Sequence, residues 1–467
     1  MRKITMKGKF FFMSGLCMLA AFLGSCKDDE KTNGVDPSRP VVFTDFSPHE
    51  GSVRTRLYIY GENFGTDPSK IHITIGGQET PVIGCTDTEI YCMIPSRSFD
   101  GDIKVSIEDN EGIVVAEHEF EDRFNYFSKT SVETLIGKKD EYGNSGNVDG
   151  TFEEARFAEP TWLLLDTFDT NNKYLYVFQT GTSMRKVDFQ NKKVSTVITN
   201  GQGLFTKMYY SCFDATGDTI FICDDHGMSN RDRVEVSYLL RSENFRKAHA
   251  YVYDRTGYSC AYQPLSKSLY YNTWWNADIS KAVWEPVAKE MVPQFVFKLY
   301  EQGDAGTYLF IHPTGNYMYI VGDNCIYKSM FNRDTNEFQS PVIFAGRRGE
   351  SQWVDGTGSL ARFRWPYQGT FVKNPDYVKE GKSDIYDFYL ADRHAYAIRK
   401  VTPEGVTTTF AGRGTPTADG EVKGYIDGDV RTEARFDEPC GLAYDEETGT
   451  FYVTDFYNRC IRSISMQ

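Results

Sequence analysis

Short apolar and aromatic runs alternate along the chain with clusters of Gly, Asp, Asn and Pro. Typical runs are Tyr174 to Phe178, Tyr317 to Asp323 and Phe388 to Asp392. Their β-branched and aromatic side chains suit a pleated surface, and the turn residues between them predict hairpins. Aromatic residues make up 15% of the sequence, which supports the same interpretation. Because helical periodicity is scarce outside the N-terminus, the pattern predicts an all-β protein.

Two patterns divide the chain, whose 467 residues exceed one ordinary domain. In residues 40–127, the alternating run Leu57 to Tyr60 ends in Gly61-Glu62-Asn63-Phe64-Gly65, where Gly and Asn tolerate positive φ. A later strand ends at Ile75-Gly76-Gly77. These motifs resemble the IPT/TIG family. The resemblance implies an Ig-like β-sandwich that serves as a spacer or interaction module.

An internal repeat marks the second region, residues 128–467. Val148-Asp149-Gly150, followed by Ala155-Arg156-Phe157, recurs twice more, with Asp-to-Arg spacings of seven, seven and eight residues. The repeated pairs are Asp149 and Arg156, Asp355 and Arg362, and Asp427 and Arg435. An Asp before Gly caps a turn and an Arg can tie neighbouring connectors, so we interpret these residues as scaffold. Regular repeats of this kind indicate a ring or array of similar units.

The repeats resemble the NHL-repeat family, which implies a six-bladed β-propeller. Two strong hairpins are joined by weaker copies whose central strands lie at residues 174–178, 219–224, 268–272 and 317–323. The last hairpin ends at Gln467 and lacks an outer strand, whereas Ser131 to Gly137 resembles an outer strand with no blade before it. Pairing these two segments would close the ring and remove its exposed sheet edges.

The first 25 residues have the features of an export signal. Four basic residues precede the apolar stretch Phe10 to Leu23, whose 14 residues are short for a membrane span. Gly24-Ser25-Cys26 then resembles a bacterial lipobox, which implies lipidation of Cys26 and anchoring by its acyl chains. The alternatives are an ordinary signal peptide and a signal anchor. In the polar segment 26–39, Lys27-Asp28-Asp29-Glu30 resembles the acidic export signal of Bacteroidota-type outer-membrane lipoproteins, with a plain solvated linker as the alternative.

Charge and cysteine content narrow the expected partners. The net charge of −14 becomes −18 when the four positive charges of the signal are removed. No basic stripe interrupts this acidity, so nucleic acid is not an expected partner. Eight cysteines remain after Cys17 and Cys26 are set aside, and none forms a CxxC pair, so neither zinc nor another cofactor is expected. Cys85 and Cys92 could pair across neighbouring strands.

Propeller topology predicts a working face. The connectors between blades and the turns between second and third strands must share one face, and most Trp residues fall there. Adjacent strand residues point to opposite sides, so at least one of Trp274 and Trp275 should reach solvent. Exposed rings beside polar groups suit sugars, although packing between blades and peptide binding are alternatives. The candidate glycan-binding residues are Trp274, Trp275, Trp284, Trp353, Trp365, Tyr367, Arg393, His394 and Tyr457.

Signals of catalysis are weak. The seven His show no metal-ligand spacing within one element, and no G-x-S-x-G motif occurs. His226 and His394 share the candidate face, which leaves open a metal site assembled in space. The order of lipobox, IPT/TIG module and propeller resembles surface lipoproteins associated with polysaccharide uptake. This resemblance implies a non-catalytic glycan-binding protein on the cell surface, held in the outer membrane beside a SusCD-like transporter. The alternatives are a protein-interaction scaffold and a propeller lyase or hydrolase.

Overall fold

The structure is a computed structural model that describes residues 34–95, 98, 100–137, 145–169, 171–301 and 306–466. The predicted signal peptide and Cys26 lie outside the described residues. Within them the chain is almost entirely strand, with one short α-helix, α1 (Pro375–Glu380), so the all-β prediction is confirmed. Contacts divide the chain into two compact units between Phe127 and Ser128. No helix of the described residues is long and apolar enough to cross a membrane.

The first unit is a β-sandwich of two four-stranded sheets. One sheet contains, in order, β1 (Val42–Ser47), β3 (Arg56–Glu62), β7 (Glu89–Met93) and β6 (Gly84–Cys85). The other contains β5 (Gln78–Thr80), β4 (Ile71–Ile75), β8 (Ile103–Glu108) and β9 (Val114–Glu119). The short strands β2 (Glu50–Gly51) and β10 (Asn125–Tyr126) pair in parallel. Alternate residues such as Leu57 and Ile59 are fully buried between the sheets, as the period of a strand requires.

The structure shows what becomes of two sequence features of this unit, the G-x-N-F-G motif and the pair Cys85 and Cys92. Asn63 of the G-x-N-F-G motif has a φ of 64°, and its side-chain amide donates to the carbonyls of Asp36 and Arg39. Cys85 and Cys92 are free thiols, so the pairing that the sequence left open does not form. The strand register explains this result, because Cys85 lies opposite Ile90 while Cys92 points into the core.

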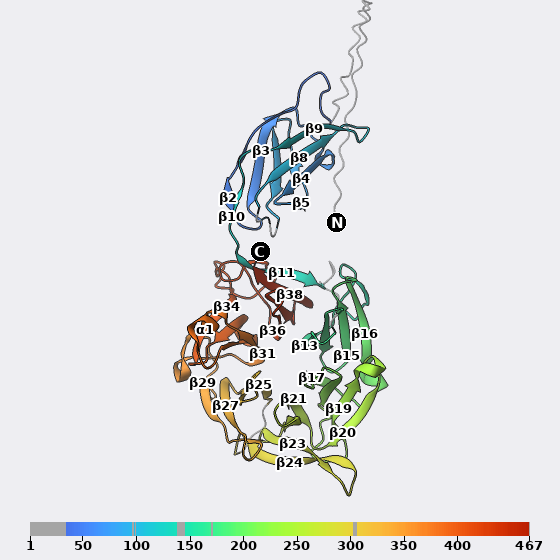
Figure 1. The fold of residues 1–467 in the computed structure, drawn as a ribbon, viewed down its shortest axis with the longest axis vertical. Helices are drawn as coiled ribbons and strands as arrows, with labels where there is room; N and C mark the ends of the chain where they lie inside the picture. The colour runs from blue at the N-terminus through green and yellow to red at the C-terminus, as the bar shows by residue number, and fades with distance from the viewer. Residues whose placement is uncertain are drawn as a thin grey trace, which may run out of the picture. The chain divides into compact units, whose positions relative to one another are not determined.

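The second unit is a six-bladed propeller, seen face-on in Figure 1. From the centre outward, the first blade contains β13 (Pro160–Asp166), β14 (Tyr174–Gln179), β15 (Ser183–Asp188) and β16 (Lys193–Thr199). The second contains β17 (Met208–Phe213), β18 (Thr219–Asp224), β19 (Val234–Leu240) and β20 (Ala248–Tyr253). The third contains β21 (Gly257–Gln263), β22 (Ser268–Thr273), β23 (Asp278–Glu285) and β24 (Glu290–Lys298). One parallel pairing, Val252 with Met291, joins the second and third sheets.

The other three blades follow the same plan. The fourth contains β25 (Tyr308–Ile311), β26 (Tyr317–Gly322), β27 (Cys325–Asn332) and β29 (Val342–Gly346), with β28 (Glu337–Phe338) beside β27. The fifth contains β31 (Pro366–Lys373), β32 (Tyr386–Asp392), β33 (Ala397–Val401) and β34 (Val406–Gly412). The sixth contains β36 (Pro439–Asp445), β37 (Thr450–Asp455), β38 (Cys460–Met466) and β11 (Thr130–Ile136). Two-residue strands β12 (Gly150–Thr151), β30 (Gly356–Thr357) and β35 (Gly428–Asp429) flank the outer strands of blades one, five and six.

Ring closure uses the strand that the sequence analysis singled out. β11, the first strand of this unit, pairs antiparallel with β38, the last, from Thr130 opposite Met466 to Ile136 opposite Ile461. Val132 and Ile136 of β11 are buried. The two ends of the propeller chain therefore form one blade, in which each strand supplies hydrogen-bond partners to the otherwise unpaired edge of the other.

A buried arginine holds each repeated Asp. Arg185, Arg399 and Arg462 have fully buried side chains and donate to Asp149, Asp355 and Asp427 at 2.7, 2.8 and 2.6 Å. Each also donates to main-chain carbonyls of the connector that carries its Asp. The Arg of the repeat instead bonds within its own connector, as when Arg156 donates to the carbonyls of Glu153 and Glu154. The repeated Asp residues are thus scaffold, and each fixes a connector to a third strand.

Candidate functional site

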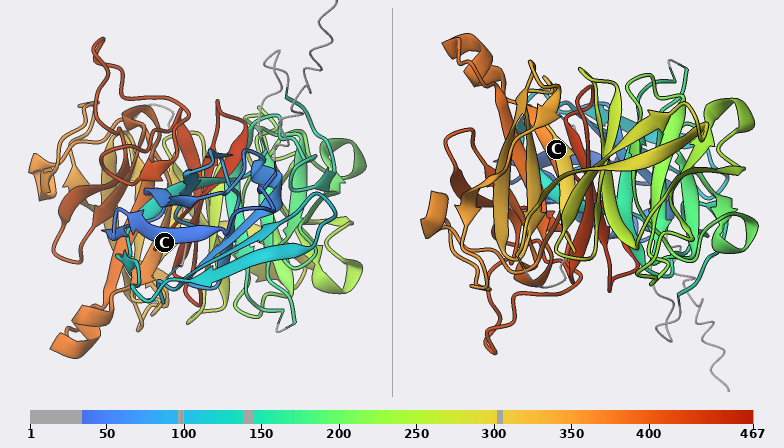
Figure 2. Two further views of the ribbon diagram at one scale, coloured as in Figure 1. Left: turned by 90° about the horizontal axis from the view of Figure 1, so that it is seen from above. Right: turned by 90° about the horizontal axis from the view of Figure 1, so that it is seen from below.

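The connectors between blades and the turns after the second strands meet on one face of the propeller. The turn that follows β32 rests on the connector before β31, because the amides of Arg393 and His394 donate to the carbonyls of Trp365 and Arg364 at 3.2 and 2.9 Å. We name this the connector face. Inner strands start there and run to the opposite face, which carries the first turns of the blades and α1; Figure 2 shows the unit from its rim.

Trp365 forms the centre of one group on the connector face. Its side chain is 46% exposed and its indole lies 4.5 Å from the imidazole of His394, edge to face. The guanidinium of Arg393 lies 4.9 Å from the same indole and 4.5 Å from the ring of Phe456. Nε and Nη2 of Arg393 each lie 2.7 Å from Oε2 of Glu438. Charge-assisted hydrogen bonds and cation–π contacts therefore fix a half-exposed aromatic surface in place.

Backbone geometry repeats across this group. Trp365 has a φ of 62°, which is unusual for a bulky residue, and its amide donates to Oδ1 of Asn324 at 3.1 Å. Glu438 occupies the equivalent position before β36 and has a φ of 60°. The same local conformation thus presents an indole in one blade and a carboxylate in the next, and Arg393 contacts both.

His394 supplies a neutral polar group beside the indole. Its Nε2 lies 3.5 Å from Oε1 of Glu438. Burial lowers the pKa of His394, and the charge of Glu438 only partly opposes this effect. At neutral pH the imidazole can therefore both donate and accept a hydrogen bond, as a sugar hydroxyl requires.

A second aromatic group lies at the start of β21 and in the turn after β22. The rings of Trp274 and Tyr258 are 5.2 Å apart, and Tyr209 stacks on Tyr258 at 6.4 Å. Trp274 and Trp275 are both half-buried, so each reaches solvent in part. This turn docks on its neighbouring connector through the Trp274 amide, which donates to the carbonyl of Thr256.

Buried rings connect the two groups through the top of the central channel. Tyr210 lies 4.8 Å from Tyr258 and 5.9 Å from Tyr367, and the hydroxyls of Tyr210 and Tyr367 are 2.6 Å apart. Tyr367 is only 3% exposed, so it supports the site from below and does not present a surface. The candidate residues chosen from the sequence did not include Tyr209, Tyr210, Tyr258, Glu438 or Phe456. A usable signal existed, because five inner strands carry a large ring near their start: Trp162, Tyr210, Tyr258, Tyr308 and Tyr367.

The other predicted residues lie at the margin of these groups or elsewhere on the propeller. Tyr457 is 42% exposed and contacts the ring of Phe456, at the margin of the Trp365 group. Trp353 is half-buried, donates to the hydroxyl of Thr409 and stacks under the guanidinium of Arg413. Trp284, 56% exposed, lies far along β23 and lines a separate cavity of about 410 Å³ with Tyr253 and other residues of blades two and three. The structure therefore does not bring Trp284 to Trp274.

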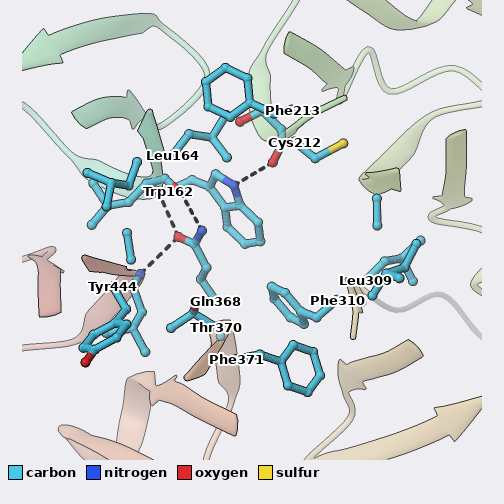
Figure 3. Close-up of a pocket in the computed structure, with 18 of the residues that line it drawn as sticks. Trp162, Leu164, Cys212, Phe213, Leu309, Phe310, Gln368, Thr370, Phe371 and Tyr444 are labelled. Atoms are coloured by element: carbon cyan, nitrogen blue, oxygen red, sulfur yellow. Dashed lines mark hydrogen bonds between the residues drawn. The ribbon is translucent and has the colours of Figure 1, made fainter. Parts of the chain in front are cut away.

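The central channel opens on the opposite face into another cavity of about 410 Å³ (Figure 3). Its inner end is closed by Trp162 and Gln368, and its walls come from all six inner strands. The indole of Trp162 donates to the carbonyl of Ser211 at 3.0 Å and lies 5.9 Å from the ring of Phe310 across the channel. This plug separates the cavity from the connector face.

No metal site is evident in the part of the chain that the structure describes, where no three His, Cys, Asp or Glu are grouped to hold an ion. His226 lies in a fully buried pair with Glu235, with Nε2 and Oε2 3.5 Å apart. His394 is instead half-exposed beside Trp365 and Glu438. The two histidines raised as candidates for a shared metal site thus have different surroundings.

Comparison with known proteins agrees with this architecture. Residues 40–122 match the IPT/TIG domain model, which confirms the first module. No curated protein sequence matches the chain. A structure from Bacteroides thetaiotaomicron described as a candidate phosphatase is 30% identical, with a TM-score of 0.70 over 93% of this chain and 99% of that chain.

Two further Bacteroides structures are similar along their whole length. An auxiliary nutrient binding protein from Bacteroides thetaiotaomicron is 37% identical, with a TM-score of 0.71 over 93% of this chain and all of that one. One from Bacteroides ovatus is 31% identical, with a TM-score of 0.70 over the same shares of 93% and 100%. The chain therefore belongs to the family represented by these Bacteroides auxiliary nutrient binding proteins.

Proposed function

We propose that this protein is a non-catalytic glycan-binding lipoprotein that captures polysaccharide on the connector face of its propeller. The half-exposed indole of Trp365, held between Arg393 and His394, is the observation that carries this proposal. Two relatives that share its fold at 31–37% identity are described as nutrient binding proteins. Polysaccharide is the nutrient whose chemistry fits a surface of aromatic rings and polar groups.

Sugar chemistry matches this surface in two ways. The C–H faces of a pyranose ring stack on an indole, while its hydroxyls need donors and acceptors at the rim. His394 and Glu438 offer such groups beside Trp365, and Tyr209 and Tyr258 offer them beside Trp274. The buried rings of Tyr210 and Tyr367 lie between the two groups, so a chain of several sugar units could contact both.

The same proposal covers location and partners. Lipidation of Cys26 would hold the mature chain in the outer membrane at the cell surface, next to a SusCD-like uptake system. Metabolic labelling with a fatty-acid analogue tests the anchor, since Cys26→Ala should abolish the label. Protease treatment of intact cells tests surface exposure, because a protein that faces the periplasm would be protected.

Binding can be tested directly on the chain without its signal segment. Native gels cast with single polysaccharides should retard the protein in at least one glycan, and calorimetry with the matching oligosaccharide should give a saturable isotherm. Substituting both Trp274 and Trp365 by Ala should abolish the retardation. Failure to bind any glycan of a broad neutral and acidic panel would refute the proposed function.

A further inference from the structure

The cavity at the far end of the channel has features of a second binding site. Most of its lining residues come from the middle and later parts of β13, β17, β21, β25, β31 and β36. Each of these strands is the terminal strand of its sheet, so it presents unpaired peptide groups along its inner edge. We propose that this cavity binds a small neutral sugar of one or two rings, independently of polysaccharide capture on the connector face. The choice of a sugar rests on the proposed function; the existence of a site rests on the cavity itself.

The side chain of Gln368 shows how unpaired peptide groups of the inner strands can obtain hydrogen-bond partners. Its Oε1 accepts from the amides of Leu163 and Leu442 at 2.9 and 3.1 Å, and its Nε2 donates to the carbonyl of Leu163 at 2.7 Å. Figure 3 shows this amide spanning between strands at the closed end of the cavity. One uncharged polar group thus satisfies three peptide groups from two other blades. The hydroxyls of a sugar offer the same donors and acceptors to the edges that line the open part of the cavity.

The walls select an uncharged ligand with apolar faces. Among the described residues that line the cavity, none is Asp, Glu, Lys, Arg or His. A charged ligand would lose its hydration without gaining a counter-charge, which is strongly unfavourable. The rings of Phe213, Phe310 and Phe371 lie on the wall and suit the C–H faces of a sugar (Figure 3). A volume of about 410 Å³ is near the lower end of small-molecule sites, which limits the occupant to one or two rings.

Two variants separate this site from the connector face. Thr370→Trp places an indole in the cavity from β31, and Phe310→Ala removes an aromatic ring from its wall. The probes are glucose, galactose, mannose, xylose and their disaccharides, with glucuronate as a charged control, measured by calorimetry and ligand-observed NMR. We expect at least one neutral probe to bind and glucuronate not to bind. Thr370→Trp should abolish that binding but leave polysaccharide retardation unchanged, whereas Trp365→Ala should leave the small sugar bound.

Phe310→Ala provides a second readout if Thr370→Trp does not fold, because it removes one aromatic ring from the cavity wall. Loss of this ring contact should weaken binding of the small sugar by about tenfold. The inference fails if no neutral probe binds the unsubstituted protein, or if both variants bind it normally. Polysaccharide binding without small-sugar binding would refute only this site, and the reverse result would refute only the proposed function.

Discussion

Trp365→Ala is the substitution that most directly tests the connector face. An indole buries about 250 Å² when fully covered, so an exposed fraction of 46% corresponds to about 115 Å². A sugar ring covers one face of the exposed part, or about 60 Å². At about 25 cal/mol per Å² this contact contributes about 1.5 kcal/mol, or roughly tenfold in affinity. Because alanine keeps a Cβ, the backbone penalty at a φ of 62° is unchanged and the difference reports the ring.

Calorimetry with the best oligosaccharide, supported by gel retardation, measures this effect. Trp284→Ala is the matched control, because Trp284 is 56% exposed but lies on β23 in a separate cavity. We expect Trp365→Ala to weaken binding about tenfold and Trp284→Ala to leave it within about twofold of the unsubstituted protein. Thermal unfolding should show that both variants keep the fold. Equal affinities for Trp365→Ala and the unsubstituted protein would refute the assignment of this face.

Three further predictions concern the scaffold. Arg399→Met should lower the unfolding free energy by about 3–5 kcal/mol, because the fully buried Asp392 loses its ion pair. Arg333→Met, on the surface, should change it by less than about 0.5 kcal/mol. Similar denaturation midpoints for the two variants would contradict the scaffold role of Arg399. Val132→Asp should prevent propeller closure, since it buries a charge in β11 against β38, and a monomeric, cooperatively melting variant would contradict this expectation. Burial raises the pKa of Glu235 well above its usual value of 4.5, so above that pH the folded state holds a proton that the unfolded state has lost. Stability should therefore fall by up to about 1.4 kcal/mol per pH unit as the pH rises above 4.5, until the folded carboxyl ionises. Glu235→Gln should flatten that slope in urea titrations, and an unchanged slope would mean that Glu235 is ionised in the folded protein.

Much of the scaffold could be predicted because it repeats. Asp149, Asp355 and Asp427 recur with their glycines, and each one occupies the same turn. The closing strand was predictable for a different reason, since an edge at Ser131 and a missing strand beside Cys460–Met466 must satisfy each other. The arginines that hold the Asp residues were not identified, because their burial depends on a strand register that spacing alone does not set.

The site was only partly predictable. Tyr367 follows Trp365 by two residues, yet one is buried in the channel and the other is half-exposed, because the connector ends between them and β31 begins. Trp284 was expected to be a glycan-binding residue together with Trp274. Instead β23 runs unbroken from Asp278 to Glu285 and carries Trp284 away from that turn. Glu438 could not be recognised as a site residue from the sequence, because it is one acidic residue among many and the fold alone brings it beside Arg393.

At some equivalent positions the blades carry different residue types, and the requirements of the propeller fold do not explain these differences. Equivalent positions before β31 and β36 hold Trp365 and Glu438, with the same positive φ but opposite chemistry. Equivalent turns hold Arg393-His394 in one blade and Phe456-Tyr457 in the next, and their docking hydrogen bonds are alike. A purely structural demand would select one residue type at each position, as it does for the buried arginines. Because Trp365, Arg393, Glu438 and Phe456 differ from their counterparts, and Arg393 contacts the other three, the boundary between blades five and six is the part of the connector face where recognition has the strongest physical basis.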